Sequence, residues 1–173
     1  LAAAEAYTRG IERRVAAGLD PFVCSVASLF ISRWDKGTAD VLEGDLKNAA
    51  GIAIGERTYK SFHDFINGER WAELKEHGAK PQRLLMASTG TKDPALPDTL
   101  YITSLAAPET VNTMPEKTLL AFADHGAVDG PMPVDGGDCE AVLAGITSAG
   151  VDLEAFADFW ELARCAEERA LLT

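Results

Sequence analysis

Two different patterns of apolar residues open the chain. Tyr7, Ile11 and Val15 recur at every fourth position in a segment rich in helix formers, which predicts a helix over residues 2–17. Residues 22–32 then read FVCSVASLFIS, an apolar and partly β-branched run without clean alternation. A run of this kind is typical of a strand that is covered on both faces, as in a parallel sheet.

The same alternation of helical and strand patterns continues along the rest of the chain. Further strands are expected over 83–89 and 110–113, and further helices over 39–66, 69–77, 114–125, 138–149 and 152–171. Thr113 and Glu116 have the spacing of a capping box for the 114–125 helix. Strands that alternate with helices indicate βαβ units and an α/β fold with a parallel sheet. Three expected strands correspond to about three eighths of the strands of a (β/α)8 barrel.

Composition and charge narrow the classes of function. The 173 residues are 47% hydrophobic and 25% charged, which is enough apolar material for one core. Acidic residues outnumber basic ones by 27 to 16, for a net charge of −11. A protein that binds nucleic acid needs basic charge to neutralise phosphates, so we expect no nucleic-acid partner. No apolar run reaches about 18 residues, so we expect no membrane span.

The cysteines favour a reducing compartment. Cys24, Cys139 and Cys165 are odd in number, far apart and without a Cys-x-x-Cys pair. This pattern argues against a disulfide scaffold and against a zinc site, and it favours the cytoplasm. Leu1 is not a methionine, and the chain opens inside a predicted helix. We therefore expect the start of the chain to be a cut and not a natural terminus.

Hydroxyl groups and cations come together where two of the predicted strands end. Ser28 precedes Arg33 at the end of the first strand, and Ser88 precedes Lys92 at the end of the second. In a barrel, the C-terminal ends of the strands face the active site. Hydroxyls, backbone N–H groups and cations together suit a phosphate, and Gly90 lets the backbone approach an anion. The spacing alone leaves it equally open that Arg33 and Lys92 are ordinary cations at loop edges.

Three strings, in order, carry a resemblance to a known family. SVASLFISRWD, RLLMASTGTKDP and DTLYITSLAAPETVNTMPEKTLLAFADHG resemble transaldolase in its bacterial branch, and the match runs from about residue 2 to 150. The opening AEAYTRGIERR resembles the helix that follows the fifth barrel strand. The resemblance implies the C-terminal portion of a (β/α)8 TIM barrel, with residues 1–173 in a single partial domain. The segment after that match resembles the family poorly, and no site is assigned to it.

The resemblance also implies an activity. Transaldolases transfer a dihydroxyacetone unit from sedoheptulose 7-phosphate to glyceraldehyde 3-phosphate in the pentose phosphate pathway, so it implies a transferase that acts on phosphosugars. A lysine amine forms a Schiff base with the ketose and serves as an electron sink for carbon–carbon cleavage. The family uses no metal and no organic cofactor, so none is expected here.

The same resemblance assigns substrate-binding residues. The family's Ser-x-Phe-x-x-Arg motif on the sixth strand matches Ser28, Phe30 and Arg33. It implies that the serine lies near the substrate, that the phenylalanine shapes the pocket and that the arginine holds the phosphate. The serine of the seventh strand matches Ser88. Many relatives carry an arginine shortly after that serine, and Lys92 is the expected substitute for its charge.

The catalytic groups of the family would precede Leu1. The Schiff-base lysine of transaldolases sits on the fourth strand, and the acidic groups that move protons sit on the first and third. None of the chain's own lysines lies in an apolar strand, where desolvation would lower the pKa of an amine. These lysines are Lys36, Lys47, Lys60, Lys75, Lys80, Lys92 and Lys117. We therefore expect no catalytic residue here, and a chain that needs the N-terminal part of the barrel or an oligomer mate.

Three functional hypotheses follow from these residues. The chain is a piece of a transaldolase whose other half is encoded elsewhere, a half-barrel that binds a phosphosugar without catalysis, or an inert fragment that folds only with a partner. Arg33, Ser88 and Lys92 serve the first two hypotheses equally well. Only the sequence upstream of Leu1 separates them.

Overall fold

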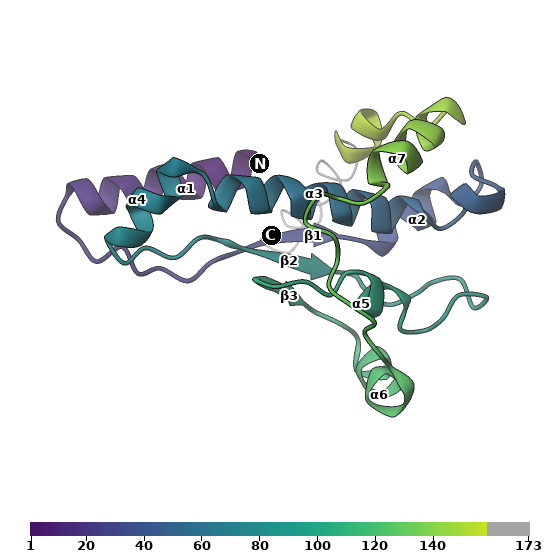
Figure 1. The fold of residues 1–173 in the computed structure, drawn as a ribbon. Helices are drawn as coiled ribbons and strands as arrows, with labels where there is room; N and C mark the ends of the chain where they lie inside the picture. The colour runs from purple at the N-terminus through teal and green to yellow at the C-terminus, as the bar shows by residue number, and fades with distance from the viewer. Residues whose placement is uncertain (159–173) are drawn as a thin grey trace, which may run out of the picture.

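Three parallel strands form the centre of the molecule in the computed structural model, which describes residues 1–158 (Figure 1). The strands lie side by side in the order β1 (Val26–Phe30), β2 (Arg83–Ala87) and β3 (Thr110–Asn112). Both pairs are parallel, and Phe30 at the end of β1 lies opposite Ala87 at the end of β2. The parallel βαβ arrangement that the sequence predicts is therefore confirmed.

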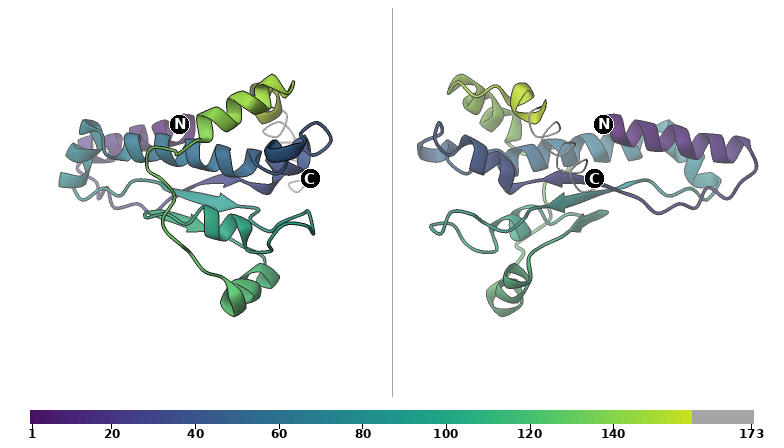
Figure 2. Two further views of the ribbon diagram at one scale, coloured as in Figure 1. Left: turned by 45° about the vertical axis from the view of Figure 1, so that its right-hand side comes forward. Right: turned by 180° about the vertical axis from the view of Figure 1, so that it is seen from behind.

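Helices line one side of these strands. Figures 1 and 2 show α1, α3 and α7 along that side, whereas α6 projects away from the sheet. The helices are α1 (Ala2–Ala16), α2 (Ser32–Thr38), the 3₁₀ helix η1 (Gly44–Leu46), α3 (Ala50–Ile66), α4 (Glu69–Glu76), α5 (Leu100–Ser104), α6 (Glu116–His125) and α7 (Cys139–Ser148). Residues 153–158 are helical too, and the rest of the helix expected over 152–171 lies outside the described residues. Within the described part of the chain, no helix is both long and apolar enough to span a bilayer.

The two faces of the sheet are buried to different extents. Met86 of β2 is fully buried and packs in one cluster with Tyr59 of α3. On the opposite face, Val26 of β1 is 45% exposed. Side chains alternate between the faces along a strand, so Ser28 and Phe30 share this open face with Val26. The expectation of a strand covered on both faces is therefore wrong for β1.

The helix expected over 39–66 is wrong in its first part. α2 begins at Ser32, directly after β1, and residues 39–49 form turns and η1 before α3 begins. Gly44 and Asn48 have φ angles of +57° and +62°, in the left-handed region that a right-handed helix does not contain. These two backbone reversals turn the chain from α2 back along the sheet as α3.

The capping box expected at the start of α6 does not form. α6 begins at Glu116 after Pro115, and no side chain caps its first turn. The Thr113 hydroxyl instead donates to the carbonyl oxygen of Met86 at 3.3 Å, which also accepts from the Thr113 N–H at 2.9 Å. Thr113 therefore extends the ladder between β2 and β3.

Candidate functional site

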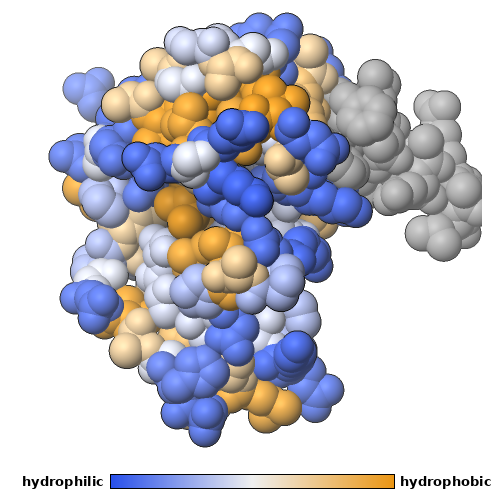
Figure 3. Space-filling model, turned by 90° about the vertical axis from the view of Figure 1, so that its right-hand side faces the viewer, coloured by the Kyte–Doolittle hydropathy of each residue, from blue (hydrophilic) through white to orange (hydrophobic). Residues whose placement is uncertain are grey.

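The C-terminal ends of the three parallel strands meet at one edge of the sheet, on the right of Figure 1, and Figure 3 looks onto this edge. Hydrophilic residues, drawn in blue, gather across the middle of that view beside an apolar patch in orange. In a (β/α)8 barrel this edge holds the active site. Phe30, Arg33, Ser88 and Lys92 all lie at or just beyond the ends of β1 and β2.

Ser88 is held at the end of β2 by a second serine, Ser32, which the sequence did not single out. Their Oγ atoms are 2.8 Å apart, and the Ser32 N–H donates to the Ser88 carbonyl oxygen at 3.1 Å. Ser32 is 1% exposed. Ser88 has a φ of +56°, a backbone conformation that costs a non-glycine residue on the order of 1 kcal/mol. The only sequence signal for Ser32 is a hydroxyl beside Arg33 at the end of an apolar run.

Arg33 lies over the ring of Phe30. The Cζ atom of its guanidinium is 4.2 Å from the ring centroid, which is within the range of a cation–π contact. Both residues line a pocket of about 490 Å³ along β1, together with Ser28 and Trp34. The structure thus brings the three residues of the Ser-x-Phe-x-x-Arg motif into one pocket.

Lys92 is exposed and lines a different pocket, of about 500 Å³, between α2 and the loop after β2. Its other charged and polar lining residues include Ser32, Asp35, Lys36, Asp40, Lys47, Asn48 and Asp93. Three lysines and three aspartates balance each other there. Ser32 connects the two regions, because it lines this pocket and also contacts Ser88. That Arg33 and Lys92 hold one phosphate stays a prediction, since each lines its own pocket.

Asp35 of α2 is a buried carboxyl group at the same edge, only 3% exposed. Its Oδ1 accepts from the Gly51 N–H at 2.9 Å, and its Oδ2 accepts from the Tyr101 hydroxyl at 2.5 Å. Burial raises the pKa of Asp35 above its usual value, and these hydrogen bonds oppose that rise. Burial and the bond to Asp35 both raise the pKa of Tyr101. No pattern in the sequence indicated that these three residues meet.

Asn112, at the end of β3, contacts the residue Thr89 that follows β2. The hydroxyl of Thr89, which is 0% exposed, donates to the Thr113 carbonyl oxygen at 2.8 Å, and its oxygen lies 2.9 Å from Asn112 Oδ1. Asn112 lies opposite Met86 and so belongs to the helix-covered face of the sheet. Its Nδ2 is buried and has no hydrogen-bond partner within residues 1–158. Asn112 does not line the pocket of Arg33, which follows β1.

The fold and this edge together define the class of protein. Parallel strands linked through helices, with polar groups at their C-terminal ends, form a portion of a (β/α)8 barrel. None of the three described strands contains a lysine. The described part of the sheet therefore holds no strand-borne amine for a Schiff base.

Comparison with known proteins identifies the family. The family model "Transaldolase/Fructose-6-phosphate aldolase" matches residues 1–166. The chain belongs to this family, and the resemblance seen in its motifs is confirmed.

Curated relatives match most of this chain with less than half of their own length. A transaldolase from Parafrankia sp. (strain EAN1pec) is 48% identical over 158 residues, which cover 86% of this chain and 43% of that protein. A transaldolase from Renibacterium salmoninarum is 53% identical over 133 residues, which cover 72% of this chain and 36% of that protein. A transaldolase from Neisseria meningitidis serogroup A is 41% identical over 158 residues, which cover 91% of this chain and 45% of that protein. The chain thus spans less than half of the length of these relatives.

Proposed function

We propose that this chain supplies the phosphosugar-binding part of a transaldolase. The observation that carries the proposal is the single pocket lined by Ser28, Phe30 and Arg33. A guanidinium donates two parallel hydrogen bonds to a phosphate group, and a serine hydroxyl can bond to a sugar oxygen. Ser88 contributes its hydroxyl beside Ser32, and Lys92 adds positive charge from the neighbouring pocket.

The complete protein would transfer a dihydroxyacetone unit from sedoheptulose 7-phosphate to glyceraldehyde 3-phosphate through a lysine Schiff base. We assign the lysine and the proton-transferring acids to a segment outside this chain, because none of the described strands carries a lysine. The lack of a lysine in the described strands also favours a second candidate, a half-barrel that binds phosphosugars without catalysis.

The open face of β1 supports a partner that completes the barrel. Val26 and Phe22 are 45% and 56% exposed, and β1 pairs with a strand on only one of its two edges within residues 1–158. Such an edge is a template for another strand. We propose the N-terminal part of a transaldolase barrel as that partner, within one domain to which residues 1–173 belong, with an oligomer mate as the alternative. The free thiols of Cys24 and Cys139 support a reducing compartment, for which we propose the cytoplasm.

Binding is tested by calorimetric titration with fructose 6-phosphate. Arg33→Ala is expected to weaken binding roughly tenfold or more, because a charge-assisted hydrogen bond contributes about 1.5–3 kcal/mol. Arg13→Ala removes the same charge from an exposed position of α1 and is expected to leave the affinity unchanged. Equal affinity of Arg33→Ala and the unaltered chain would place the phosphate elsewhere.

Borohydride reduction separates the enzyme from the binding module. With fructose 6-phosphate, the chain alone is expected to keep its mass. When it is mixed with the part of the Parafrankia transaldolase that precedes the matching region, an adduct is expected on the added segment. An adduct on this chain itself would show that the nucleophile lies within it. Intact binding without any adduct in the mixture would favour the non-catalytic module.

A further inference from the structure

The helix α2, which carries part of the candidate site, is too short to be stable without tertiary contacts. α2 has 7 residues, and isolated helices of this length are marginal in water. Its first turn nevertheless carries Ser32, which contacts Ser88, and Arg33, which lies over Phe30. The placement of both residues therefore depends on whatever anchors α2 to the rest of the fold.

One buried carboxylate contributes to that anchor by joining three helices. Asp35 lies one turn beyond Ser32 in α2, and its Oδ1 accepts from the Gly51 N–H in the first turn of α3. N–H groups in the first turn of a helix have no partner within that helix, so this bond satisfies one of them. The other oxygen accepts from Tyr101 of α5, whose side chain is 1% exposed and belongs to the main core cluster.

The absence of a side chain at Gly51 makes this approach possible. A Cβ atom there would lie 2.8 Å from Asp35 Oδ2 and 3.0 Å from the carbonyl oxygen of Ile31. Ile31 immediately precedes Ser32, so the start of α3 contacts α2 both at its entry and at its carboxylate. The close contact between α2 and α3 therefore depends on two residues, Gly51 in α3 and the buried Asp35 in α2.

We propose that Asp35 is a positioning residue for the phosphosugar site. By tying α2 to α3 and α5, it holds Arg33 over Phe30 and Ser32 against Ser88. The identity of the ligand rests on the proposed function, whereas the placement of Arg33 can be measured without any ligand. Loss of the bonds of Asp35 frees α2 to shift, and Arg33 then leaves the ring.

The first measurement follows the side-chain Nε–Hε signal of Arg33 by NMR in the 173-residue chain. The ring current of Phe30 shifts this signal, and Phe30→Leu gives the position without the ring. We expect Asp35→Ala and Tyr101→Phe to move the signal toward that position. Leu74→Ala, in the separate cluster between α1 and α4, serves as a control that lowers stability in a cluster without any residue of α2, and its Arg33 signal is expected to stay in place.

The second measurement is the affinity for fructose 6-phosphate, well below the melting temperature of each variant. Asp35→Ala and Tyr101→Phe are expected to weaken binding on the order of tenfold, because small displacements of a binding group are costly. Leu74→Ala is expected to bind as the unaltered chain does. This control separates a positioning role from a general loss of stability.

The outcomes distinguish this proposal from the proposed function. An Arg33 signal that stays in place in folded Asp35→Ala would overturn the positioning role, and so would unchanged affinity despite a moved signal. If Asp35→Ala does not fold, Tyr101→Phe decides in the same way. If the unaltered chain binds no fructose 6-phosphate while the signal moves as expected, the proposed function fails and the placement of Arg33 by Asp35 stands.

Discussion

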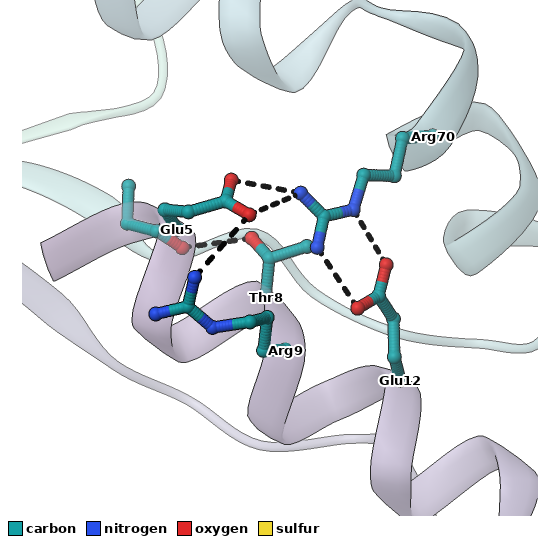
Figure 4. Close-up of polar contacts among 6 residues, drawn as sticks. Glu5, Thr8, Arg9, Glu12 and Arg70 are labelled. Atoms are coloured by element: carbon teal, nitrogen blue, oxygen red, sulfur yellow. Dashed lines mark hydrogen bonds and ion pairs between the residues drawn. The ribbon is translucent and has the colours of Figure 1, made fainter. Parts of the chain in front are cut away.

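Arg70 of α4 forms a two-point ion pair with Glu12 of α1 (Figure 4). Its Nη2 donates to Glu12 Oε2 at 2.8 Å and its Nε donates to Oε1, while its Nη1 donates to both oxygens of Glu5 at 2.7 Å. The hydrogen bond from Arg70 holds the pKa of Glu12 below its usual value. One guanidinium thus links two positions of α1, about two helical turns apart, to α4, next to the cluster of Ile11 and Trp71.

Arg70→Lys is expected to destabilise the fold by about 0.5–1 kcal/mol, because an ammonium cannot bond to both carboxylates in this geometry. The side chains are 36–39% exposed, so the cost should shrink at about 0.5 M salt. Urea unfolding followed by circular dichroism measures both effects. Arg9→Lys is the control, since Arg9 is 3.8 Å from Glu5. A cost at Arg70 that salt leaves unchanged would contradict this account.

Two helical glycines should respond to alanine in opposite directions. A Cβ atom at Gly10 in α1 would meet nothing within 4 Å among residues 1–158, so Gly10→Ala is expected to stabilise the fold by up to about 1 kcal/mol through helix propensity. Gly51→Ala places a Cβ 2.8 Å from a carboxylate oxygen of Asp35 and is expected to destabilise the fold by roughly 1–3 kcal/mol. Thermal and urea unfolding of the two variants give the comparison. Stabilisation by Gly51→Ala would mean that the Asp35 contact yields at little cost.

Features set by short-range pattern were predicted well. The helix expected over 2–17 is observed as Ala2–Ala16, because its apolar spacing and the glycine that follows are local signals. The motif residues Ser28, Phe30 and Arg33 lie in one pocket because strand periodicity and the turn into α2 place them together. Local sequence patterns do not fix the position of Lys92, which lies in the loop after β2 and lines another pocket.

Features set by three-dimensional packing could not be predicted. α6 ends at His125 as expected, and Gly126 after it has a φ of −72°, outside the left-handed region. A Cβ atom there would lie 2.1 Å from the Phe122 ring, so close packing and not backbone freedom explains the glycine. Ser32 and Asp35 were missed for the same reason, because their partners lie 16 to 66 residues away in the chain.

The left-handed backbone of Ser88 predicts an unusual order of stability. Ser88→Ala and Ser88→Gly both lose the contact with Ser32, but only glycine adopts a φ of +56° without steric cost. After the entropy that glycine loses on folding, Ser88→Gly should be more stable than Ser88→Ala by about 0.5–1 kcal/mol. Ser28, in the extended backbone of β1, is the matched control, and there alanine should be the more stable of the two. Urea unfolding that shows alanine ahead at both positions would contradict the strain at Ser88.

His125, the last residue of α6, should titrate above its ordinary pKa. Its Nε2 lies 2.9 Å from Asp98 Oδ1 and its Nδ1 lies 3.2 Å from Asp124 Oδ2, and these hydrogen bonds raise the pKa of the imidazole above 6.5. A folded-state pKa above the unfolded value means that the stabilisation is fully present below about pH 6.5 and is lost as the pH rises through the folded pKa. An NMR titration of the ring protons measures the midpoint. Asp98→Asn removes the stronger partner and is expected to lower it. A midpoint that Asp98→Asn leaves unchanged would show that the bond to Asp98 does not stabilise the charged ring.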